Sequence, residues 1–356
     1  MNHALNNFRE RIIAASANRT ALCIRGSGSK DWYGQVPMGE PFDTRAYSGI
    51  VAYDPTELVI TARCGTPLAE IESALDEQNQ MLAFEPAHFG SGCTIGGAVA
   101  SGLSGPRRAA VGALRDFVLG AVLMDGRGDV LSFGGQVMKN VAGYDVSRLL
   151  AGSLGVLGLI LEVSLKVLPK PFAETSLCFD MDQHEAIRHL NEWGGQPLPV
   201  SASVWHDGQL TLRLSGADAA VKSAQHKLGG DAMADGAQFW QAIRDQRHAF
   251  FTRNNRANAG LWRLSLPSVS PPLTLEAAQL IEWGGAQRWL YSDADAASIR
   301  AAAQAAGGHA TLFRGGDKNV GVFHPLAPAV ARIHRNLKTA FDPAGIFNPA
   351  RMFPEL

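Results

Sequence analysis

The chain has 356 residues, of which 46% are hydrophobic and 18% are charged, and its formal net charge is -1. This length suffices for two domains with sizeable cores, and the composition is that of a globular protein rather than a disordered or fibrous one. The near-neutral charge, without a dense basic run or interleaved arginine and aromatic residues, excludes nucleic acid as the main partner.

The first sixteen residues, MNHALNNFRERIIAAS, have charged and amide side chains where a signal peptide would have a continuous apolar core. We expect an amphipathic helix there, and no export. Cys23, Cys64, Cys93 and Cys178 are scattered without a CxxC pair, which predicts neither a disulfide framework nor a zinc or iron–sulfur site. These features indicate a reducing, cytoplasmic setting.

A short apolar run, ALCI, leads into a first loop that is rich in small residues. The loop consists of Arg25, Gly26, Ser27, Gly28, Ser29 and Lys30. Its main chain is almost unshielded, so a ligand can approach the amide N–H groups closely, and such nests bind anions, usually phosphate. The alternative is an ordinary Gly/Ser turn at the end of a strand.

A strand-to-helix unit follows the first loop. Leu58–Ala62 is rich in β-branched and apolar residues, and Thr66 and Pro67 are typical of the N-cap and first position of a helix. The apolar residues of 68–75 then recur at helical spacing, with acidic residues on the other face. The pattern predicts an amphipathic surface helix that packs against a sheet.

A second glycine-rich stretch extends from Pro86 to Gly105 and contains six glycines with hardly any large side chain near them. Each glycine costs about 1 kcal/mol relative to alanine in a helix, so we expect something to lie close to this backbone. Val118–Met124 and Val130–Phe133, joined at Asp125-Gly126, then predict a β-hairpin.

The longest apolar stretch, Leu149–Val163, contains three glycines and is too short for a comfortable membrane span, so it predicts buried structure. The segment VLGLILEVSLKVLPKP predicts a strand pair that ends at prolines. We place a domain boundary at Pro171, with a first domain at 1–171.

Residues 172–316 contain an internal echo. Glu192–Gly195 and Glu282–Gly285 both read EWGG, and each is followed by residues typical of strands, an alanine-rich helix and a Gly-Gly pair. A duplicated β-α-β arrangement of the split ferredoxin-like type would produce this echo, although the repeat can also be accidental. The remaining segment, 317–356, predicts a helix at Leu326–Ala340 and a compact turn in FDPAGIFNPARMF.

Four segments in order resemble the FAD-binding family of the vanillyl-alcohol oxidase type, also called PCMH-type. They are RGSGSK, TIGGAVASG, the block GYDVSRLLAGSLGVLGLILEVSLKVLPKP (Gly143–Pro171) and the terminal FDPAGIFNP. Within that family, PTELVITARCGTPL, GPRRAAVGALRDFVLG and FGGQVMKNVAGYDVSRLLAGSLGVLG are similar to the E-type FAD-binding subunits of bacterial glycolate oxidases, over the whole chain.

The resemblance implies an α+β fold: a two-subdomain PCMH-type FAD-binding domain, a ferredoxin-like α/β cap and a C-terminal segment that returns to the flavin. By resemblance, the first loop and Thr94, Ile95, Gly96 and Gly97 enclose the FAD diphosphate from two sides. The remaining implied contacts are Pro86, Gly102 and Asp116 at the flavin or its loops, Leu159 and Ile160 at adenine, and Asn348 at the flavin ring.

Several of these implied FAD contacts can instead have a purely structural role. Asp116 can cap the turn into the next strand, and Asn348 can start a turn before Pro349. Arg25 and Lys30 can be solvated side chains beside the loop.

Two departures from the family pattern restrict the chemistry. Ser29 stands where many relatives have a histidine bonded to the flavin, so we expect noncovalent FAD unless a residue such as His88 substitutes. The ten histidines form no His-x-His or Glu-His pair of the kind that holds a metal in relatives that oxidise 2-hydroxy acids. No catalytic base stands out, and we expect no metal.

The resemblance implies two companions in one complex, a related FAD-containing catalytic subunit and an iron–sulfur subunit, with a small 2-hydroxy acid as the substrate. It also implies contact with the inner face of the membrane through that complex. The alternatives are a self-sufficient dehydrogenase of another hydroxy acid and a flavin-free scaffold. A nicotinamide-binding loop is excluded because Asp31 replaces the third glycine of G-x-G-x-x-G.

Overall fold

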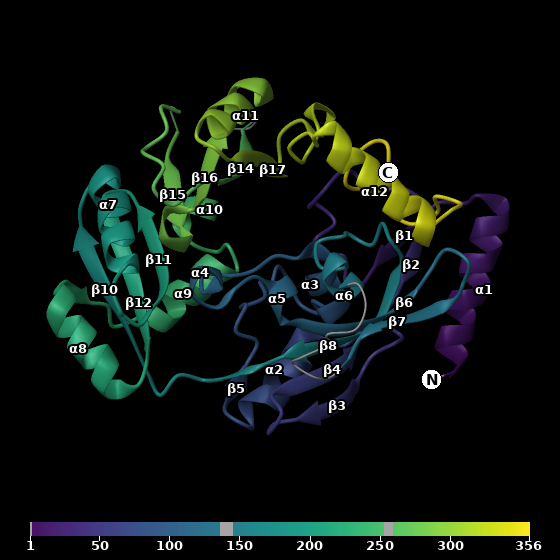
Figure 1. The fold of residues 1–356 in the computed structure, drawn as a ribbon, viewed down its shortest axis with the longest axis horizontal. Helices are drawn as coiled ribbons and strands as arrows, with labels where there is room; N and C mark the ends of the chain where they lie inside the picture. Colours follow the sequence, from purple (N-terminus) through teal and green to yellow (C-terminus); the bar gives the residue numbers. More distant parts are fainter. Residues whose placement is uncertain (1, 136–144, 253–258, 276) are drawn as a thin grey trace. The chain divides into compact units, whose positions relative to one another are not determined.

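The computed structural model describes residues 2–135, 145–252, 259–275 and 277–356. Gly143 and Tyr144, which carry part of the resemblance, lie outside these residues. The chain divides into two compact units (Figure 1). Unit 1 comprises Met1–Leu103, Ala113–Pro169 and Pro325–Leu356, and unit 2 comprises Ser104–Gly112 and Lys170–His324.

Unit 1 is built around a five-stranded antiparallel sheet with the order β3-β4-β8-β6-β7. Its strands are β3 (Ile50–Asp54), β4 (Val59–Arg63), β6 (Val118–Met124), β7 (Val130–Gly134) and β8 (Leu159–Lys166). The central strand β8 is almost wholly buried, as expected for a strand covered on both faces. The expected hairpin is confirmed, since β6 pairs antiparallel with β7.

Further elements of unit 1 lie outside this sheet. They are α1 (Asn2–Asn18), α2 (Leu68–Asp76), β5 (Gln80–Met81), α3 (Ile95–Ser101), α5 (Leu114–Phe117), α6 (Val146–Leu149), β9 (Leu168–Pro169) and α12 (Pro328–Phe341). The strand pair expected at 156–171 is wrong. β8 pairs with β4 and β6, and β9 pairs with β5, because the chain leaves the sheet at its prolines instead of turning back.

The expected cap of α2 is also wrong. The helix begins at Leu68 without a side-chain cap. The Thr66 hydroxyl instead accepts from Gly49 N at 2.9 Å and donates to Gly49 O at 3.1 Å. The Thr66 hydroxyl therefore makes a tertiary contact in place of the helix cap that the local pattern predicts.

A second, parallel strand pair carries the first loop. β1 (Leu22–Arg25) pairs with β2 (Glu40–Asp43), and the C-terminal segment adds to the other side of β1. Leu22 N donates to Ile346 O at 2.7 Å, and Asn348 N donates to Leu22 O at 2.9 Å. The two ends of the sequence thus form one backbone ladder.

Unit 2 has an eight-stranded sheet with the order β13-β10-β12-β11-β15-β16-β14-β17. Its strands are β10 (Ala173–Asp180), β11 (Val200–His206), β12 (Gln209–Gly216), β13 (Asp231–Ala232), β14 (Gly260–Ser265), β15 (Gln279–Glu282), β16 (Gln287–Ser292) and β17 (His309–Arg314). Its helices are α4 (Arg108–Val111), α7 (Gln183–Gly194), α8 (Asp218–Leu228), α9 (Gly236–Arg244), α10 (Ala249–Thr252) and α11 (Ala296–Ala305), with short 3-10 turns η1 (Trp283–Gly285) and η2 (Lys318–Val320).

The sheet of unit 2 is a duplicated ferredoxin-like arrangement. Each half of the sheet has four strands. When they are numbered in chain order within their half and read from the outer edge inward, both halves have the order 4-1-3-2. The two halves join where β11 pairs antiparallel with β15. The expected α+β fold with a ferredoxin-like cap is confirmed. The EWGG echo itself is out of phase: the first copy ends α7, whereas the second follows β15 and forms η1.

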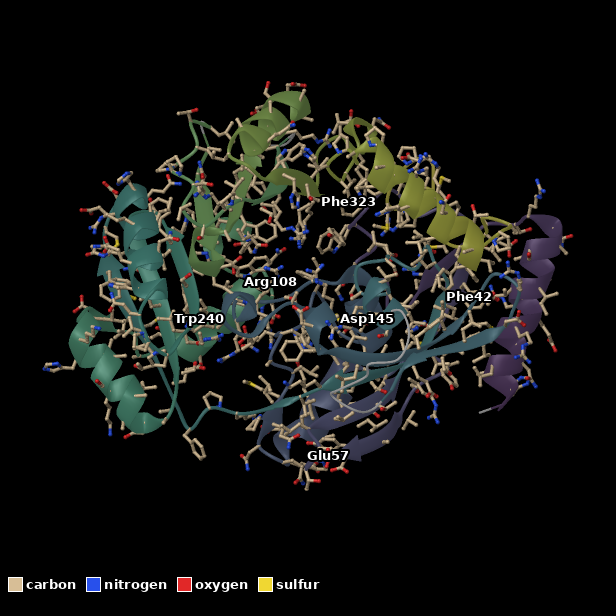
Figure 2. The ribbon with its side chains drawn as sticks, viewed as in Figure 1. Phe42, Glu57, Arg108, Asp145, Trp240 and Phe323 are labelled. Carbon is tan, nitrogen blue, oxygen red and sulfur yellow. The ribbon has the colours of Figure 1, made fainter. Side chains whose placement is uncertain are left out.

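The segment Ser104–Gly112 belongs to unit 2, although it comes from the middle of the sequence of unit 1. Arg107 forms an ion pair with Glu174 at 2.8 Å. Arg108, which is labelled in Figure 2, has its guanidinium 4.4 Å from the centroid of the Trp283 ring. The Trp283 indole N–H donates to Gly105 O at 3.1 Å. No helix of the described chain combines the length and apolar character needed to cross a bilayer.

A buried ion pair holds the C-terminal turn of unit 1. Lys338 Nζ donates to Asp342 Oδ2 at 2.7 Å, to Val156 O at 2.8 Å and to Phe347 O at 2.7 Å. Asp342, which is 1% exposed, also accepts from the backbone N–H groups of Ile346 and Phe347. Burial lowers the pKa of Lys338, and the Asp342 carboxylate opposes that shift.

We predict that Lys338→Met destabilises the protein by about 3–5 kcal/mol, because it leaves the Asp342 carboxylate buried without its partner. The measurement is chemical denaturation followed by circular dichroism. Arg45→Met is the matched control, since Arg45 likewise donates three hydrogen bonds, but all of them reach the Asp43 carboxylate and the site is exposed. Equal losses of stability for the two variants would contradict a special contribution of the buried pair.

Candidate functional site

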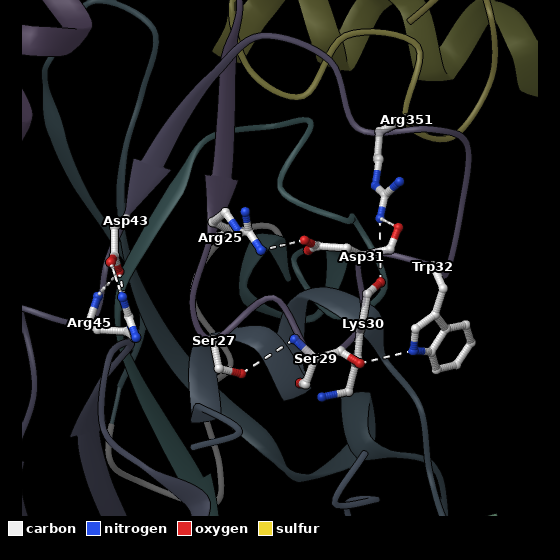
Figure 3. Close-up of polar contacts among 9 residues, drawn as sticks. All are labelled: Arg25, Ser27, Ser29, Lys30, Asp31, Trp32, Asp43, Arg45 and Arg351. Carbon is white, nitrogen blue, oxygen red and sulfur yellow. Dashed lines mark hydrogen bonds and ion pairs between the residues drawn. The ribbon is translucent and has the colours of Figure 1, made fainter. Parts of the chain in front are cut away.

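The first loop leaves β1 at Arg25 and turns back on itself before Trp32 (Figure 3). Gly28 occupies the left-handed region with φ of 75°, which L side chains rarely adopt. The Ser27 hydroxyl accepts from Ser29 N at 3.4 Å, and the Trp32 indole N–H donates to Ser29 O at 2.9 Å. These contacts fix the course of the loop, whose small residues are half-buried.

The amides of this loop are unusually free. Within the described chain, the N–H groups of Gly26, Ser27, Gly28 and Lys30 donate no hydrogen bond to a protein acceptor. Backbone N–H groups that are partly shielded from water require an acceptor. Consecutive donors on a bare backbone form a nest that fits an anion.

Arg351 supplies a second donor group to the same place from the C-terminal segment. Its Nη2 donates to Asp31 O at 2.9 Å and to Lys30 O at 3.4 Å (Figure 3). The side chain is 7% exposed, and within the described residues its buried Nη1 has no hydrogen-bond partner. Burial lowers the pKa of Arg351, with the Asp31 carboxylate opposing. An anion that reaches Nη1 would satisfy this buried donor.

Two further cations lie on the first loop. Arg25 forms an ion pair with Asp31 at 2.5 Å, and the Lys30 ammonium lies 5.8 Å from the centroid of the Phe89 ring. Burial lowers the pKa of Lys30, and Cys93 opposes the shift. With Arg351, these groups outnumber the single carboxylate of Asp31, so the site carries excess positive charge.

The second glycine-rich loop differs from the first, because its amides at the start of α3 are already bonded. Ile95 N donates to Thr66 O, Gly96 N donates to Cys64 O, and Gly97 N donates to the Thr94 hydroxyl. These three amides are therefore not available to a ligand. A methyl group on Gly96 would lie 2.7 Å from Cys64 Cβ, and one on Gly26 would clash with the Thr94 hydroxyl. Both glycines are thus required for protein packing.

Two adjoining clefts in unit 1 share Ile24, Arg25, Gly26, Gly97, Ala100, Leu154 and Asn348, and we call them together the loop groove. Most of the residues singled out from the sequence line it. They are Arg25, Gly26, Ser27, Gly28, Ser29, Lys30, Thr94, Gly96, Gly97, Leu159, Ile160 and Asn348. One end is therefore the cationic first loop, and the other is the start of β8 with Gly155 and Gly158 just before it.

Asn348, which lines both clefts of the loop groove, is held by two short side-chain hydrogen bonds. Its side-chain oxygen accepts from Ile24 N at 2.7 Å, and its amide group donates to Leu154 O at 2.6 Å. Gly155 lies so close that a methyl group there would be 2.8 Å from Asn348 Nδ2. Asn348 thus holds the first loop, the 154–155 turn and the C-terminal segment together.

Four of the residues singled out from the sequence lie outside the lining of the loop groove. Ile95 and Pro86 are buried, and Gly102 ends α3 with φ of 62° and packs against the Gly152 backbone. Asp116 is exposed, and its carboxylate accepts from Ala113 N at 2.8 Å. Sequence reasoning alone singles out neither Arg351 nor Leu154 as a cofactor contact, because neither has a motif of its own.

Comparisons with known proteins bear on this groove. Residues 6–134 match the family model described as FAD binding domain. The chain is 50% identical to glycolate oxidase subunit GlcE of Escherichia coli (strain K12) over 347 residues, which cover 98% of this chain and 97% of that protein. The chain belongs to the GlcE family of glycolate oxidase subunits. The resemblance inferred from the four segments is confirmed.

The GlcE family is related to a wider group of proteins. The chain is 30% identical to glycolate oxidase subunit GlcD of Bacillus subtilis (strain 168) over 168 residues, covering 47% of this chain and 36% of that protein. Against the solved structure of alkyldihydroxyacetonephosphate synthase, the TM-score is 0.64 at 15% identity, over 96% of this chain and 74% of that chain. This second likeness shows the fold alone.

The loop groove fits the FAD that the matched domain implies. The free amides of the first loop and the unpaired Nη1 of Arg351 suit a diphosphate, which brings two negative charges and several acceptor oxygens. The cleft that reaches Gly158, Leu159 and Ile160 has small and apolar walls that suit a flat ring. Cys64 also lines this cleft, and burial raises the pKa of its thiol to about 12.

Gly96 and Gly97 provide a test of how the second loop packs. We predict that Gly96→Ala destabilises the protein by about 1–3 kcal/mol, because the new methyl group has no room beside Cys64. Gly97→Ala is the matched control, since its methyl group would have only the Thr94 hydroxyl within contact distance, at 3.3 Å, and alanine favours helix. Thermal unfolding measures both variants, and an unaltered melting temperature for Gly96→Ala would refute the packing argument.

Proposed function

We propose that this chain is an FAD-holding subunit of a complex that oxidises glycolate to glyoxylate and passes the electrons to an iron–sulfur companion. The observation that carries the proposal is the loop groove, with its free amides and excess positive charge, in a chain similar to GlcE along almost its whole length. A related flavin subunit, of which GlcD is the counterpart among the relatives, is the second companion.

In this proposal the first loop and Arg351 bind the FAD diphosphate. Thr94, Gly96 and Gly97 form the opposite wall, Leu159 and Ile160 lie against adenine, and Asn348 approaches the flavin ring. The remaining assignments are Ile95, Pro86, Gly102 and Asp116, which support the loops. We assign 1–171 to the FAD-binding domain, 172–316 to the cap and 317–356 to the segment that returns to the flavin.

Bound FAD would supply a two-electron acceptor that can release its electrons one at a time. The role of the protein is to bind and orient the FAD. Lys30, Arg25 and Arg351 would neutralise the diphosphate, and the hydrogen bonds of Asn348 would fix the wall against which the ring system lies. Substrate oxidation is assigned to the related flavin subunit, with this FAD as a relay or as an assembly element.

The FAD is proposed to be noncovalent. Ser29 lacks the imidazole by which relatives bond the flavin, and its hydroxyl accepts from the Cys93 thiol at 3.2 Å. The ring of His88 is held by Glu72 at 3.0 Å. The four cysteines are all unpaired, which supports a reducing compartment such as the cytoplasm, with membrane contact only through the complex.

An absorption spectrum of the purified chain tests the proposal directly. We expect flavin absorption bands after reconstitution with FAD. When the protein is then denatured with acid, all of the flavin should pass into the supernatant. Under anaerobic conditions, we expect glycolate to bleach the bands only when both companion subunits are present. If glycolate bleaches the flavin bands of the isolated chain, the chain has its own substrate site. A lack of flavin bands would overturn the cofactor proposal.

The lowered pKa of Lys30 predicts a pH dependence of FAD binding. Burial lowers this pKa below the ordinary value of 10.5, so the free protein loses the positive charge at a lower pH than an exposed lysine would. The protonated form attracts the diphosphate, and FAD affinity should therefore fall as the pH rises toward 10.5. Binding constants come from quenching of flavin fluorescence.

Lys30→Arg is the informative variant, because arginine stays protonated throughout this range. We expect its FAD affinity to remain level where that of the unaltered protein falls. Lys222→Arg, at an exposed ion pair with Asp218, should leave the pH profile unchanged. Identical profiles for Lys30→Arg and the unaltered protein would exclude Lys30 as the titrating group.

A further inference from the structure

A carboxylate lines the cleft that we assign to the FAD diphosphate. Asp31 shares this cleft with Arg25, Lys30 and Arg351 and with the first loop, whose amides are free. Among the residues that line the loop groove, Asp31 is the only acidic one. Like charges repel at short range, so this carboxylate opposes a bound diphosphate unless another group neutralises it.

The group that neutralises Asp31 is Arg25. Their side chains point toward one another, and Arg25 Nη2 lies 2.5 Å from Asp31 Oδ2 (Figure 3). Within the part of the chain that the structure describes, Asp31 is the only ion-pair partner of Arg25. A methyl group on Gly28 would overlap the guanidinium and lie 3.0 Å from Asp31 Oδ2. The ion pair therefore rests directly on the backbone of the first loop.

The cations of the cleft are held to different degrees. Arg351 is 7% exposed, and its Nη2 is fixed by the carbonyl groups of Lys30 and Asp31. The Arg25 and Asp31 side chains are instead 38% and 40% exposed, and an ion pair so accessible to water contributes little stability. Arg25 can therefore change its partner at small cost, whereas Arg351 stays in place.

We infer that the FAD diphosphate displaces Asp31 from Arg25, and that this competition limits the affinity of the loop groove for FAD. A diphosphate offers several acceptor oxygens and two charges to the planar guanidinium, whereas the carboxylate offers two oxygens and one charge. While no anion occupies the groove, Asp31 balances the charge of Arg25. This inference rests on the proposed function, since it requires FAD in the groove.

Asp31→Asn tests the competition, because it removes the charge and keeps nearly the same shape. FAD affinity, measured by quenching of flavin fluorescence, should rise by about three- to tenfold, since both the repulsion and the competing ion pair are lost. Asp218→Asn is the matched control, because Asp218 forms an exposed ion pair with Lys222 outside the loop groove. It should change the affinity by less than about twofold.

An unaltered or weaker affinity in Asp31→Asn overturns the inference, since a weaker one means that Asp31 orients Arg25 toward FAD. Melting temperatures verify that each variant is folded, and we expect Asp31→Asn to melt close to the unaltered protein because the lost pair is exposed.

A double-mutant cycle with Arg25→Gln distinguishes an exchange of partners from simple repulsion. If Asp31 only repels the diphosphate, Asp31→Asn raises the affinity by the same factor whether or not Arg25 is present. If Arg25 changes its partner, the gain also contains the energy of the broken ion pair. The gain should then be about two- to fivefold larger with Arg25 present than in Arg25→Gln. Equal gains overturn the exchange.

FAD binding by the unaltered chain separates this inference from the proposed function. If the unaltered chain binds FAD and the gains in the cycle are equal, the cofactor assignment stands and only the exchange fails. If neither the unaltered chain nor any of these variants binds FAD, the cofactor proposal fails, and the inference fails with it.

Discussion

The loop groove depends on hydrogen bonds that join the two ends of the sequence. Asn348 reaches Ile24 and Leu154, and Lys338 reaches Val156 and Phe347. Each of these polar groups is buried, so its partners must be present or the fold loses the full cost of desolvation. The first loop can remain bare and open because the residues on either side of it are held by contacts from outside the loop.

Glycine serves two different purposes in this site. In the first loop it leaves amides free, whereas at Gly96 it allows α3 to pack directly on Cys64. A glycine-rich motif therefore does not by itself distinguish a ligand contact from a backbone contact. The difference lies in the hydrogen bonds: the amides of Gly96 and Gly97 are occupied, and within the described chain those of Gly26 and Gly28 are not.

Features that depend on local pattern could be predicted from the sequence, such as the β6–β7 hairpin, the first loop and the repeat in unit 2. Features that depend on distant contacts could not. Thr66 has the chemistry of a helix cap, but Gly49 takes its hydroxyl. Lys338 and Asp342 have the spacing of a surface pair, yet both are buried. Arg351 carries no motif, and its role appears only through contacts with residues about 320 positions earlier.

The segments of the two units alternate along the chain, and this alternation sets the order in which the parts of each unit are synthesised. Unit 2 needs Ser104–Gly112, which is made long before Lys170–His324, and unit 1 needs Pro325–Leu356, which is made after both. Arg107, the partner of Glu174, is therefore already present when Glu174 is made, whereas β1 lacks Ile346 and Asn348 until all of unit 2 has been made. A nascent chain can thus complete the sheet of unit 2 before it can close the loop groove.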